Sequence, residues 1–165
     1  MGLLEARIIN DLIGNRHLNI VVDLGCGEGV LGWIIRSKVN YLIGVDHNKY
    51  RLTSAEGRNV YDELVFCDIR DYMPPPRTEA VIMIEVIEHI TKEDGELLLS
   101  QLGWVPIIVL TTPQKFSPFS FRNGHVSLWT QQDFISLGYE TMLFGRPFRF
   151  EFFFGKTLLA YKGLS

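Results

Sequence analysis

The sequence predicts an α/β fold built on a mostly parallel sheet, and three observations support this prediction. Short apolar runs alternate with stretches of helical periodicity, which is the pattern of strands joined by crossover helices. The runs are apolar on both faces, as expected for strands that are covered on both sides. A chain of 165 residues with 47% hydrophobic and 21% charged residues suits one globular unit. We therefore expect residues 1–165 to form a single domain.

Each expected element has a local reason in the sequence. The strands are the short apolar runs at 20–24, 41–45, 63–67, 80–84, 105–110, 139–144 and 150–161. The helices are the amphipathic or capped segments at 3–14, 30–37, 49–57, 91–102 and 130–137. The buried face of the first helix is expected to hold Leu4, Ile8, Ile9, Leu12 and Ile13. Thr91 and Thr130 are placed to cap the last two helices.

Composition and charge exclude several classes of protein. The net charge of −3 at pH 7 argues against a general nucleic-acid coat protein. No apolar run approaches the roughly 18 residues that a membrane-spanning helix needs, and Glu5 interrupts what would be the basic and apolar start of a signal peptide. Cys26 and Cys67 fall at the ends of the first and third strands and are expected to lie too far apart for a disulfide. We expect free thiols and a cytoplasmic protein.

Acidic residues follow four successive predicted strands. They are Asp23, Asp46, Asp68 and Glu85, the last of which is accompanied by Glu88 and His89. Ligands of open α/β sheets bind beyond the carboxyl ends of the strands, so these side chains are expected at the binding site. Because buried carboxylates are costly without partners, the pattern predicts a ligand rich in hydroxyl and amino groups.

The glycine-rich loop after the first strand has two interpretations. Gly27, Gly29 and Gly32 match the spacing of a dinucleotide-binding loop, and Asp46 follows about 20 residues on, where a ribose-binding acid would lie. Asp23 and Glu28 flank the loop, however, and carboxylates repel a pyrophosphate. The same acids suit a ligand with an ammonium and a sulfonium group, so the electrostatics favour S-adenosylmethionine over NAD.

Four segments together resemble the motifs of class I S-adenosylmethionine-dependent methyltransferases. They are Val-Val-Asp-Leu-Gly-Cys-Gly-Glu-Gly at 21–29, Gly-Val-Asp at 44–46, Cys-Asp-Ile at 67–69 and Ile-Glu-Val-Ile-Glu-His-Ile at 84–90. The resemblance covers about residues 18–140. It implies a seven-stranded sheet that is mostly parallel and ends in an antiparallel hairpin, with helices on both faces. It also implies S-adenosylmethionine as the cofactor.

The resemblance implies a role for each residue of the cofactor site. Asp23 and the backbone of Gly25 and Gly27 would hold the methionine part of the cofactor, and Asp46 would bind the ribose hydroxyls. Asp68 would accept from the adenine amino group, with Ile69 against the ring. The remaining residues expected at the cofactor are Cys26, His47 and Glu85.

The catalytic residues are expected to be Glu85, His89 and His125, and two interpretations of them stay open. In the first, no metal binds, Glu88 or His89 hydrogen-bonds to His125, and Glu85 faces the methyl group. In the second, Glu85, Glu88, His89 and His125 hold Mg²⁺, as in the small-RNA 3′-terminal 2′-O-methyltransferases, which this segment and Thr111-Thr112-Pro113 also resemble. Gln114 departs from that family, which tends to have Asn at this position.

The acceptor and the partners follow less directly from the sequence. The sequence after the fourth strand differs from the Asn-Pro-Pro-Tyr-like motif of amide and nucleobase N-methylation. We expect a small-molecule, sugar or lipid-precursor acceptor, with nucleic acid not favoured; the alternatives are the metal-dependent RNA enzyme and a non-catalytic cofactor-binding subunit. The aromatic hairpin, with Phe148, Phe150 and Phe152–Phe154, is a candidate homodimer surface. Phe116, Phe119 and Phe121 are expected near the acceptor.

Overall fold

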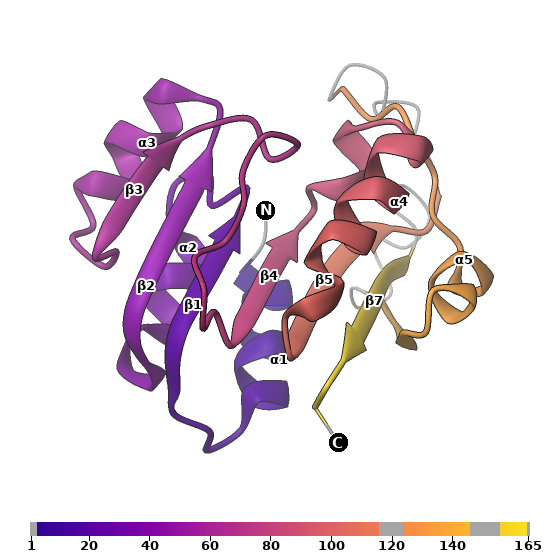
Figure 1. Ribbon diagram of the computed structural model, residues 1–165, viewed down its shortest axis with the longest axis horizontal. Coiled ribbons are helices and arrows are strands. Elements are labelled where there is room, and N and C mark those ends of the chain that lie inside the picture. Colours follow the sequence, from indigo (N-terminus) through magenta and orange to yellow (C-terminus); the bar gives the residue numbers. More distant parts are fainter. Residues whose placement is uncertain (1–2, 116–123, 146–155, 165) are drawn as a thin grey trace.

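A seven-stranded sheet forms the centre of the protein, which was studied as a computed structural model describing residues 3–115, 124–145 and 156–164 (Figure 1). The strands are β1 (Leu18–Leu24), β2 (Val39–Asp46), β3 (Glu63–Phe66), β4 (Ala80–Ile84), β5 (Ile107–Pro113), β6 (Glu140–Gly145) and β7 (Lys156–Lys162). Their order across the sheet is β3-β2-β1-β4-β5-β7-β6. β1 to β5 pair in parallel, whereas β7 runs antiparallel to both β5 and β6. This arrangement confirms the predicted fold class.

The described part of the chain also contains five helices and three 3₁₀ segments. The helices are α1 (Leu3–Ile13), α2 (Val30–Ile35), α3 (Lys49–Glu56), α4 (Lys92–Gln101) and α5 (Gln131–Ser136). The 3₁₀ segments are η1 (Arg36–Lys38), η2 (Ile87–His89) and η3 (Leu102–Trp104). The predicted N-caps are both present: the side chain of Thr91 accepts from the backbone N–H of Asp94, and Thr130 forms a capping box with Asp133.

The two faces of the sheet have separate apolar cores. On one face, α1 and α2 pack against the sheet through residues such as Ile9 and Ile35. On the other face, α4 and α5 do the same through Leu98 and Phe134. Figure 1 shows α4 in front of the sheet and α1 and α2 behind it. The strands between these layers are apolar on both sides because each side is covered.

The buried face of α1 differs from the predicted one. Leu4 was expected inside but is 38% exposed, whereas Glu5 is 2% exposed. The buried line runs through Glu5, Ile9 and Ile13, whose spacing of four residues follows one ridge of the helix. Ile8 and Leu12 pack only at the edge of this ridge. The amphipathic pattern predicted the helix correctly, but the helix is rotated about its axis relative to the predicted buried face.

The C-terminal hairpin is confirmed in its direction, and several aromatic residues predicted to be important lie outside the described residues. β6 and β7 pair antiparallel, with Met142 opposite Leu159. The predicted start of the last strand at residue 150 lies outside the described residues, as do the phenylalanines of 146–155 and 116–123. The predicted dimer surface and acceptor contacts therefore stay predictions.

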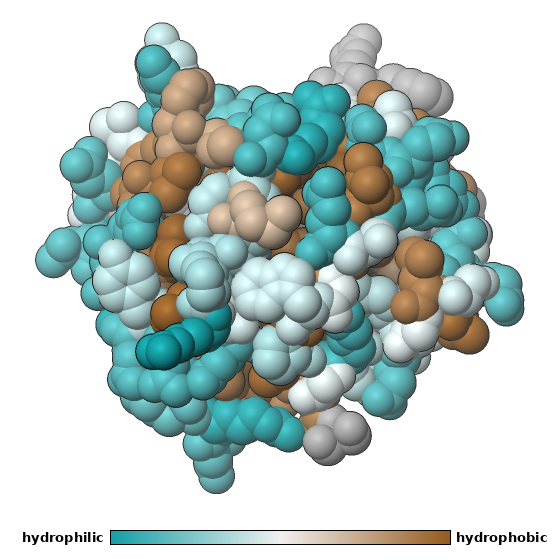
Figure 2. Space-filling view, viewed as in Figure 1, coloured by the Kyte–Doolittle hydropathy of each residue, from teal (hydrophilic) through white to brown (hydrophobic). Residues whose placement is uncertain are grey.

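The described surface is mixed in polarity. Figure 2 shows apolar side chains on one face that are interspersed among polar ones. In the ranges that the structure describes, we find no helix with the length and apolar character that crossing a bilayer demands. Cys26 and Cys67 are free thiols, as predicted.

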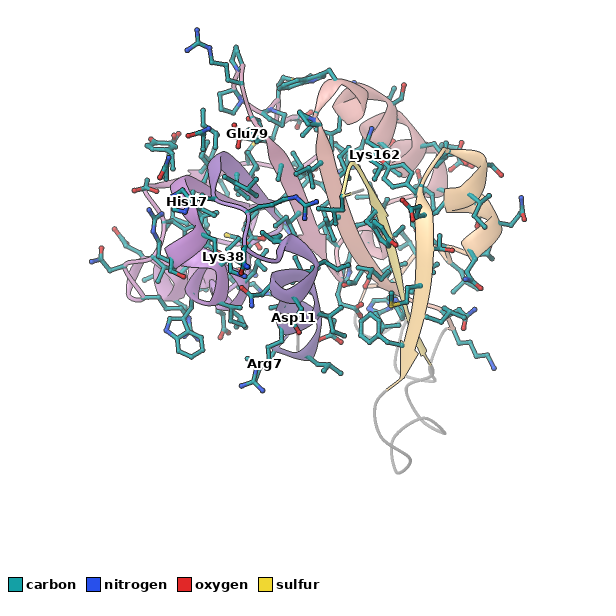
Figure 3. All side chains as sticks on the ribbon, turned by 90° about the horizontal axis from the view of Figure 1, so that it is seen from below. Arg7, Asp11, His17, Lys38, Glu79 and Lys162 are labelled. Atoms are coloured by element: carbon teal, nitrogen blue, oxygen red, sulfur yellow. The ribbon has the colours of Figure 1, made fainter. Side chains whose placement is uncertain are left out.

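Glu79 and His17, both labelled in Figure 3, lie at the amino-terminal edge of the sheet. Glu79, just before β4, accepts from the backbone and side-chain N–H groups of Asn19 at 2.8 and 2.7 Å. His17, just before β1, is hydrogen-bonded to Asn40 at 2.7 Å. Both of these polar groups are therefore satisfied by side chains or backbone of the protein itself.

Candidate functional site

The predicted acidic residues gather at the carboxyl edge of the parallel strands. Asp23 is the penultimate residue of β1 and Asp46 the last residue of β2, while Asp68 and Glu85 follow β3 and β4. Adjacent strands bring these positions together, because Asp23 lies opposite Gly44 in the register of β1 and β2. Asp23 and Asp46 are 2% and 4% exposed. Two carboxylates are therefore buried at the edge where ligands of this architecture bind.

The loop after β1 has a backbone conformation that requires its glycines. Gly25, Gly27 and Gly29 have φ values of 83°, 55° and 82°, in the left-handed region that side chains disfavour. The backbone N–H groups of Gly25 and Cys26 donate to the carbonyl of Val45 at 2.8 and 2.9 Å, which folds the loop onto β2. The loop thus passes directly beside the carboxylate at the end of β2.

Asp46 holds this loop through hydrogen bonds, and its carboxylate can still accept further hydrogen bonds. One carboxylate oxygen accepts from the backbone N–H of Gly27 at 2.9 Å, and the other from that of Asn48 at 2.8 Å. A carboxylate offers about four acceptor positions, so each oxygen can take a second donor. His47 is exposed, with Nδ1 3.9 Å from Asp46 Oδ1. Asp46 is thus held in place by the backbone and remains able to bind hydroxyl groups.

Asp23 is held by a residue that the sequence analysis missed. The hydroxyl of Tyr61 donates to Asp23 Oδ2 at 2.6 Å. Burial raises the pKa of Asp23 to about 7, the Tyr61 hydrogen bond opposes this increase, and the charge of Asp46 adds to it. Burial and the same two carboxylates raise the pKa of the Cys26 thiol, which stays protonated. The carboxylates of Asp23 and Asp46 are therefore close enough to repel each other and are poorly solvated.

Asp68 already has a cationic partner. Arg70 donates to it from Nε at 3.0 Å, from Nη2 at 2.7 Å and from its backbone N–H at 3.0 Å. The hydrogen bonds of Arg70 hold the pKa of Asp68 at about 2. Arg70 also contacts Asp94 at 3.4 Å. Ile69, expected against an adenine ring, is 6% exposed and belongs to the apolar core. The sequence analysis did not identify Arg70 as a partner of Asp68.

Glu85 and Glu88 lie close together after β4. Glu85 has φ 54°, a strained conformation for a residue with a side chain, and its N–H donates to Thr111 at 3.0 Å. Glu88 is fully buried and accepts from the hydroxyl of Thr112 at 3.1 Å. Burial and the neighbouring Glu85 raise the pKa of Glu88 well above its usual value. Its Oε1 has no hydrogen-bond partner among the described residues.

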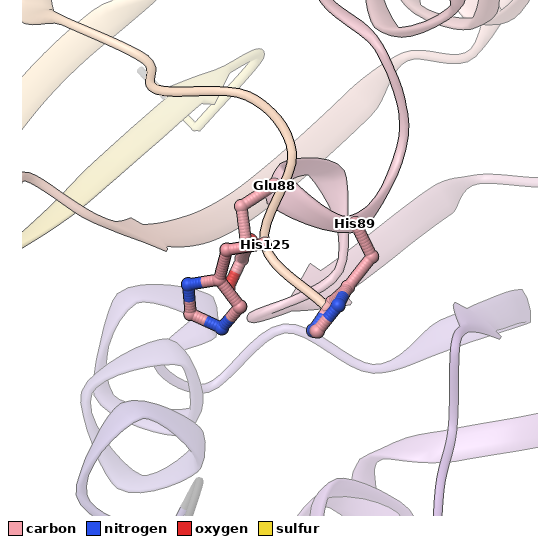
Figure 4. A group of neighbouring side chains, drawn as sticks. All are labelled: Glu88, His89 and His125. Atoms are coloured by element: carbon pink, nitrogen blue, oxygen red, sulfur yellow. The ribbon is translucent and has the colours of Figure 1, made fainter. Parts of the chain in front are cut away.

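His89 and His125 lie next to Glu88 (Figure 4). The two rings pack edge to face with centroids 4.8 Å apart, and the loop carrying His125 is tied to η2 because the carbonyl of Glu88 accepts from Val126 and Ser127 at 2.8 and 3.2 Å. The hydrogen bond expected from Glu88 or His89 to His125 is not formed in the described structure: His89 Nδ1 meets the carbonyl of Gly124 at 3.2 Å, and His125 Nδ1 has no partner there. The loop is held through its backbone instead.

The side chains of Glu88, His89 and His125 form a compact donor set. One potential ligand atom from each lies within 4.8 Å of the other two. Burial lowers the pKa of His125, and partial desolvation lowers that of His89 although this residue is exposed, which favours the neutral forms that metal ligands and bases require. The structure groups three of the four residues in the predicted alternative metal site; Glu85 is not in this group.

Comparison with known proteins bears on the fold. No protein family model and no curated protein sequence matches the chain. Among solved structures, the N-methyltransferase NodS from Bradyrhizobium japonicum WM9 aligns with 96% of this chain and 93% of its own, at 13% identity and a TM-score of 0.76. Magnesium protoporphyrin IX methyltransferase (ChlM) from Synechocystis PCC 6803 with bound SAH aligns with 97% of this chain and 83% of its own, at 13% identity and a TM-score of 0.71.

A third similar structure is the methyltransferase domain of bacterial CtHen1. It aligns with 95% of this chain and 96% of its own, at 18% identity and a TM-score of 0.64. Together these similarities assign the chain the fold of class I S-adenosylmethionine-dependent methyltransferases. The alignments run over nearly the whole chain, so the similarity is to the complete sheet with its C-terminal hairpin.

Proposed function

We propose that the protein is an S-adenosylmethionine-dependent methyltransferase that binds its cofactor over the carboxyl ends of β1 and β2. The burial of Asp23 and Asp46 beside the glycine loop, with no Lys or Arg ion pair to either in the described ranges, is the observation that supports this most directly. A ligand carrying an ammonium and a sulfonium would supply the missing positive charge. A pyrophosphate would be repelled by both carboxylates.

The proposed cofactor contacts follow the geometry of this edge. Asp23 and the backbone of Gly25, Cys26 and Gly27 would bind the methionine part, and the remaining acceptor positions of Asp46 would take the ribose hydroxyls. His47 would lie beside the ribose, Ile69 beside the adenine, and Glu85 beside the methyl group. Asp68 accepts three bonds from Arg70, which leaves about one acceptor position for the adenine amino group.

The proposed reaction is an in-line displacement on the methyl carbon. An acceptor oxygen forms the new C–O bond as the C–S bond breaks, and the electron pair leaves on sulfur to give neutral S-adenosylhomocysteine. The acceptor proton needs a base, and His125 or His89 is suited to this role because desolvation favours the neutral form of both imidazoles. The protein otherwise acts by positioning the two reactants. The acceptor class that we propose is a hydroxyl of a small molecule, sugar or lipid precursor.

Calorimetric titration with S-adenosylmethionine and S-adenosylhomocysteine tests the cofactor assignment. We expect micromolar dissociation constants, about −8 kcal/mol, for the wild type and a loss of at least tenfold for Asp46→Ala. Asp71→Ala, an exposed acid in the turn after Asp68, serves as the matched control and should bind normally. Binding of NAD in place of either ligand would overturn the proposal.

The donor set favours a second candidate function, a metal-dependent 2′-O-methylation of RNA. Glu88 Oε1 is a buried polar atom without a partner in the described structure, and a divalent cation beside it would satisfy it. Glu88, His89 and His125 would hold the ion, with Glu85 nearby. When bound, such an ion lowers the pKa of a hydroxyl that it contacts. The protein's own contribution would be to hold the donors at the mouth of the cofactor site.

Titration with Mg²⁺ and Mn²⁺ alone distinguishes the two candidates. The metal-dependent function predicts binding of at least one ion to the wild type, lost in Glu88→Ala and kept in Glu56→Ala, an exposed glutamate on α3. It also predicts that a chelator abolishes methyl transfer to an RNA 3′ end. If no ion binds and transfer to a small acceptor survives the chelator, the metal-independent function stands.

A further inference from the structure

Tyr61 is a half-buried residue whose role the proposed mechanism does not explain. It lies between α3 and β3, on the far side of β2 from the strand that carries Asp23. Its hydroxyl nevertheless reaches Asp23 Oδ2 at 2.6 Å, 38 positions earlier in the chain. The ring of Tyr61 can reach this buried carboxylate only if the elements that lie between them leave space for it.

Two glycines without unusual backbone angles provide that passage. A Cβ at Gly32, on α2, would lie 2.6 Å from Cζ and 2.7 Å from the hydroxyl oxygen of Tyr61. A Cβ at Gly44, on β2 and opposite Asp23, would lie 3.0 Å from the ring. These glycines have no positive φ that would require them. Their absent side chains make room for Tyr61, so part of the glycine pattern serves this ring rather than a ligand.

The groups that face Asp23 define what the hydroxyl does. The loop after β1 contributes the Cys26 thiol, β2 contributes Asp46, and the α3–β3 connection contributes Tyr61; β4 contributes the apolar Ile82 at the paired position. Burial and Asp46 raise the pKa of Asp23, and the Tyr61 hydrogen bond lowers it. Of these neighbours, the Tyr61 hydroxyl is the one that stabilises the charged form.

We propose that Tyr61 is a positioning residue, which fixes the Asp23 side chain and keeps it ionised so that it can bind the ammonium group of the cofactor. This inference rests on the proposed function, because Asp23 would have no ammonium to bind in a protein of another kind. Tyr61 lies outside the glycine loop and would act on the cofactor indirectly, through its hydrogen bond to Asp23. Without the hydroxyl, Asp23 would take up a proton at a higher pH.

The test is the binding of S-adenosylhomocysteine to wild type and Tyr61→Phe between pH 5.5 and 9. Wild-type affinity should fall as Asp23 is protonated below a pH of about 7. Tyr61→Phe should move this inflection upward by about one pH unit, since hydrogen bonds to charged groups change equilibria by roughly tenfold or more. At pH 7 the variant should therefore bind about fivefold more weakly, and the difference should vanish at pH 9. The ligand's own amine titrates in both proteins and cancels in the comparison.

Proton release gives a second readout that a purely structural role would not change. Titrations at pH 7 in two buffers of different ionisation enthalpy should show more protons released per ligand bound by Tyr61→Phe than by wild type. Tyr41→Phe is the matched control, because it removes a hydroxyl that donates to Glu63 at 3.3 Å on the surface. It should reproduce the wild-type profile.

The outcomes separate this inference from the proposed function. If the wild type binds neither S-adenosylmethionine nor S-adenosylhomocysteine, the proposed function falls and this inference falls with it. If the wild type binds and Tyr61→Phe keeps the same pH profile, only the inference is wrong. Should Tyr61→Phe not fold, the carboxyl ¹³C resonance of Asp23 in labelled wild type decides the premise: a pKa near 7 supports it, and one near the usual 3.8 overturns it.

Discussion

Replacing Asp23 by Asn is expected to stabilise the ligand-free protein at alkaline pH while removing its affinity for the cofactor. The side chain is 2% exposed, and its pKa is about 7 in the folded protein against a usual value of 3.8. Between these two pH values the unfolded chain releases the proton and the folded one retains it, so stability falls as the pH rises. The penalty is complete above about pH 7.

The structure sets the size of this effect. The difference of about three units between the folded and unfolded pKa of Asp23 corresponds to ~4 kcal/mol as an upper limit. Relaxation of the site reduces this value, so we expect Asp23→Asn to raise the free energy of unfolding by about 2–4 kcal/mol at pH 8. Asn has nearly the same shape and can still accept the hydrogen bond of Tyr61. At pH 4 the gain should be below about 1 kcal/mol, because the folded wild type is then protonated.

Urea unfolding followed by circular dichroism at pH 8 and pH 4 measures both values. Asp62→Asn is the control of opposite sign. Despite partial burial, hydrogen bonds from Leu42 and Arg36 lower the pKa of Asp62, so its replacement should destabilise the protein at pH 8. Excess S-adenosylhomocysteine, at about 100 times its dissociation constant, should stabilise wild type by about 2.7 kcal/mol and leave Asp23→Asn unchanged. An Asp23→Asn protein that is no more stable than wild type at pH 8 would refute the reasoning.

Three further predictions follow from the geometry of the same edge. Arg70→Ala should strengthen cofactor binding up to about fivefold by calorimetry, because the adenine amino group no longer competes with the guanidinium; weaker binding would count against this competition. Gly25→Ala should lower the free energy of unfolding in urea by about 2–4 kcal/mol, since its Cβ would lie 2.4 Å from Val86. Gly27→Ala, with open space around its Cβ, should lower it by about 1 kcal/mol. Equal losses for the two variants would contradict this prediction. His125→Asn should lower the rate of methyl transfer to a hydroxyl by about 10²–10⁴-fold while cofactor affinity stays within about threefold, and an unchanged rate would exclude His125 as the base.

Those parts of the site that depend on position along a strand could be predicted from the sequence. Asp23 and Asp46 end apolar runs, and parallel strands necessarily bring such ends to one edge. Glycines at 25 and 27 predict a turn, and their positive φ values are ones that residues with side chains disfavour. Local pattern and chain topology were sufficient for these residues.

The partners of those acids could not be predicted in the same way. Tyr61 lies in a connection with no periodic pattern, and its ring reaches Asp23 through space left by glycines on two other elements. Arg70 looks like an ordinary surface residue of a turn until the turn folds it back onto Asp68. The rotation of α1, which buries Glu5, likewise depends on how the helix meets the sheet and not on its own pattern. Each of these features is a property of packing between distant segments.

Individual acidic side chains at the two ends of the sheet differ in their surroundings, as Glu79 at one end and Asp23 and Glu88 at the other illustrate. At the amino-terminal edge, Glu79 is matched by donors of Asn19, and its pKa is lowered by them. At the carboxyl edge, burial and the charge of Asp46 raise the pKa of Asp23, and burial and the charge of Glu85 raise that of Glu88. When ionised, both groups lower the stability of the folded protein at neutral pH. A positive charge that enters from outside the chain would stabilise the ionised form of both groups. The stability of the ligand-free protein at neutral pH should therefore rise when Asp23 or Glu88 is replaced by its neutral amide.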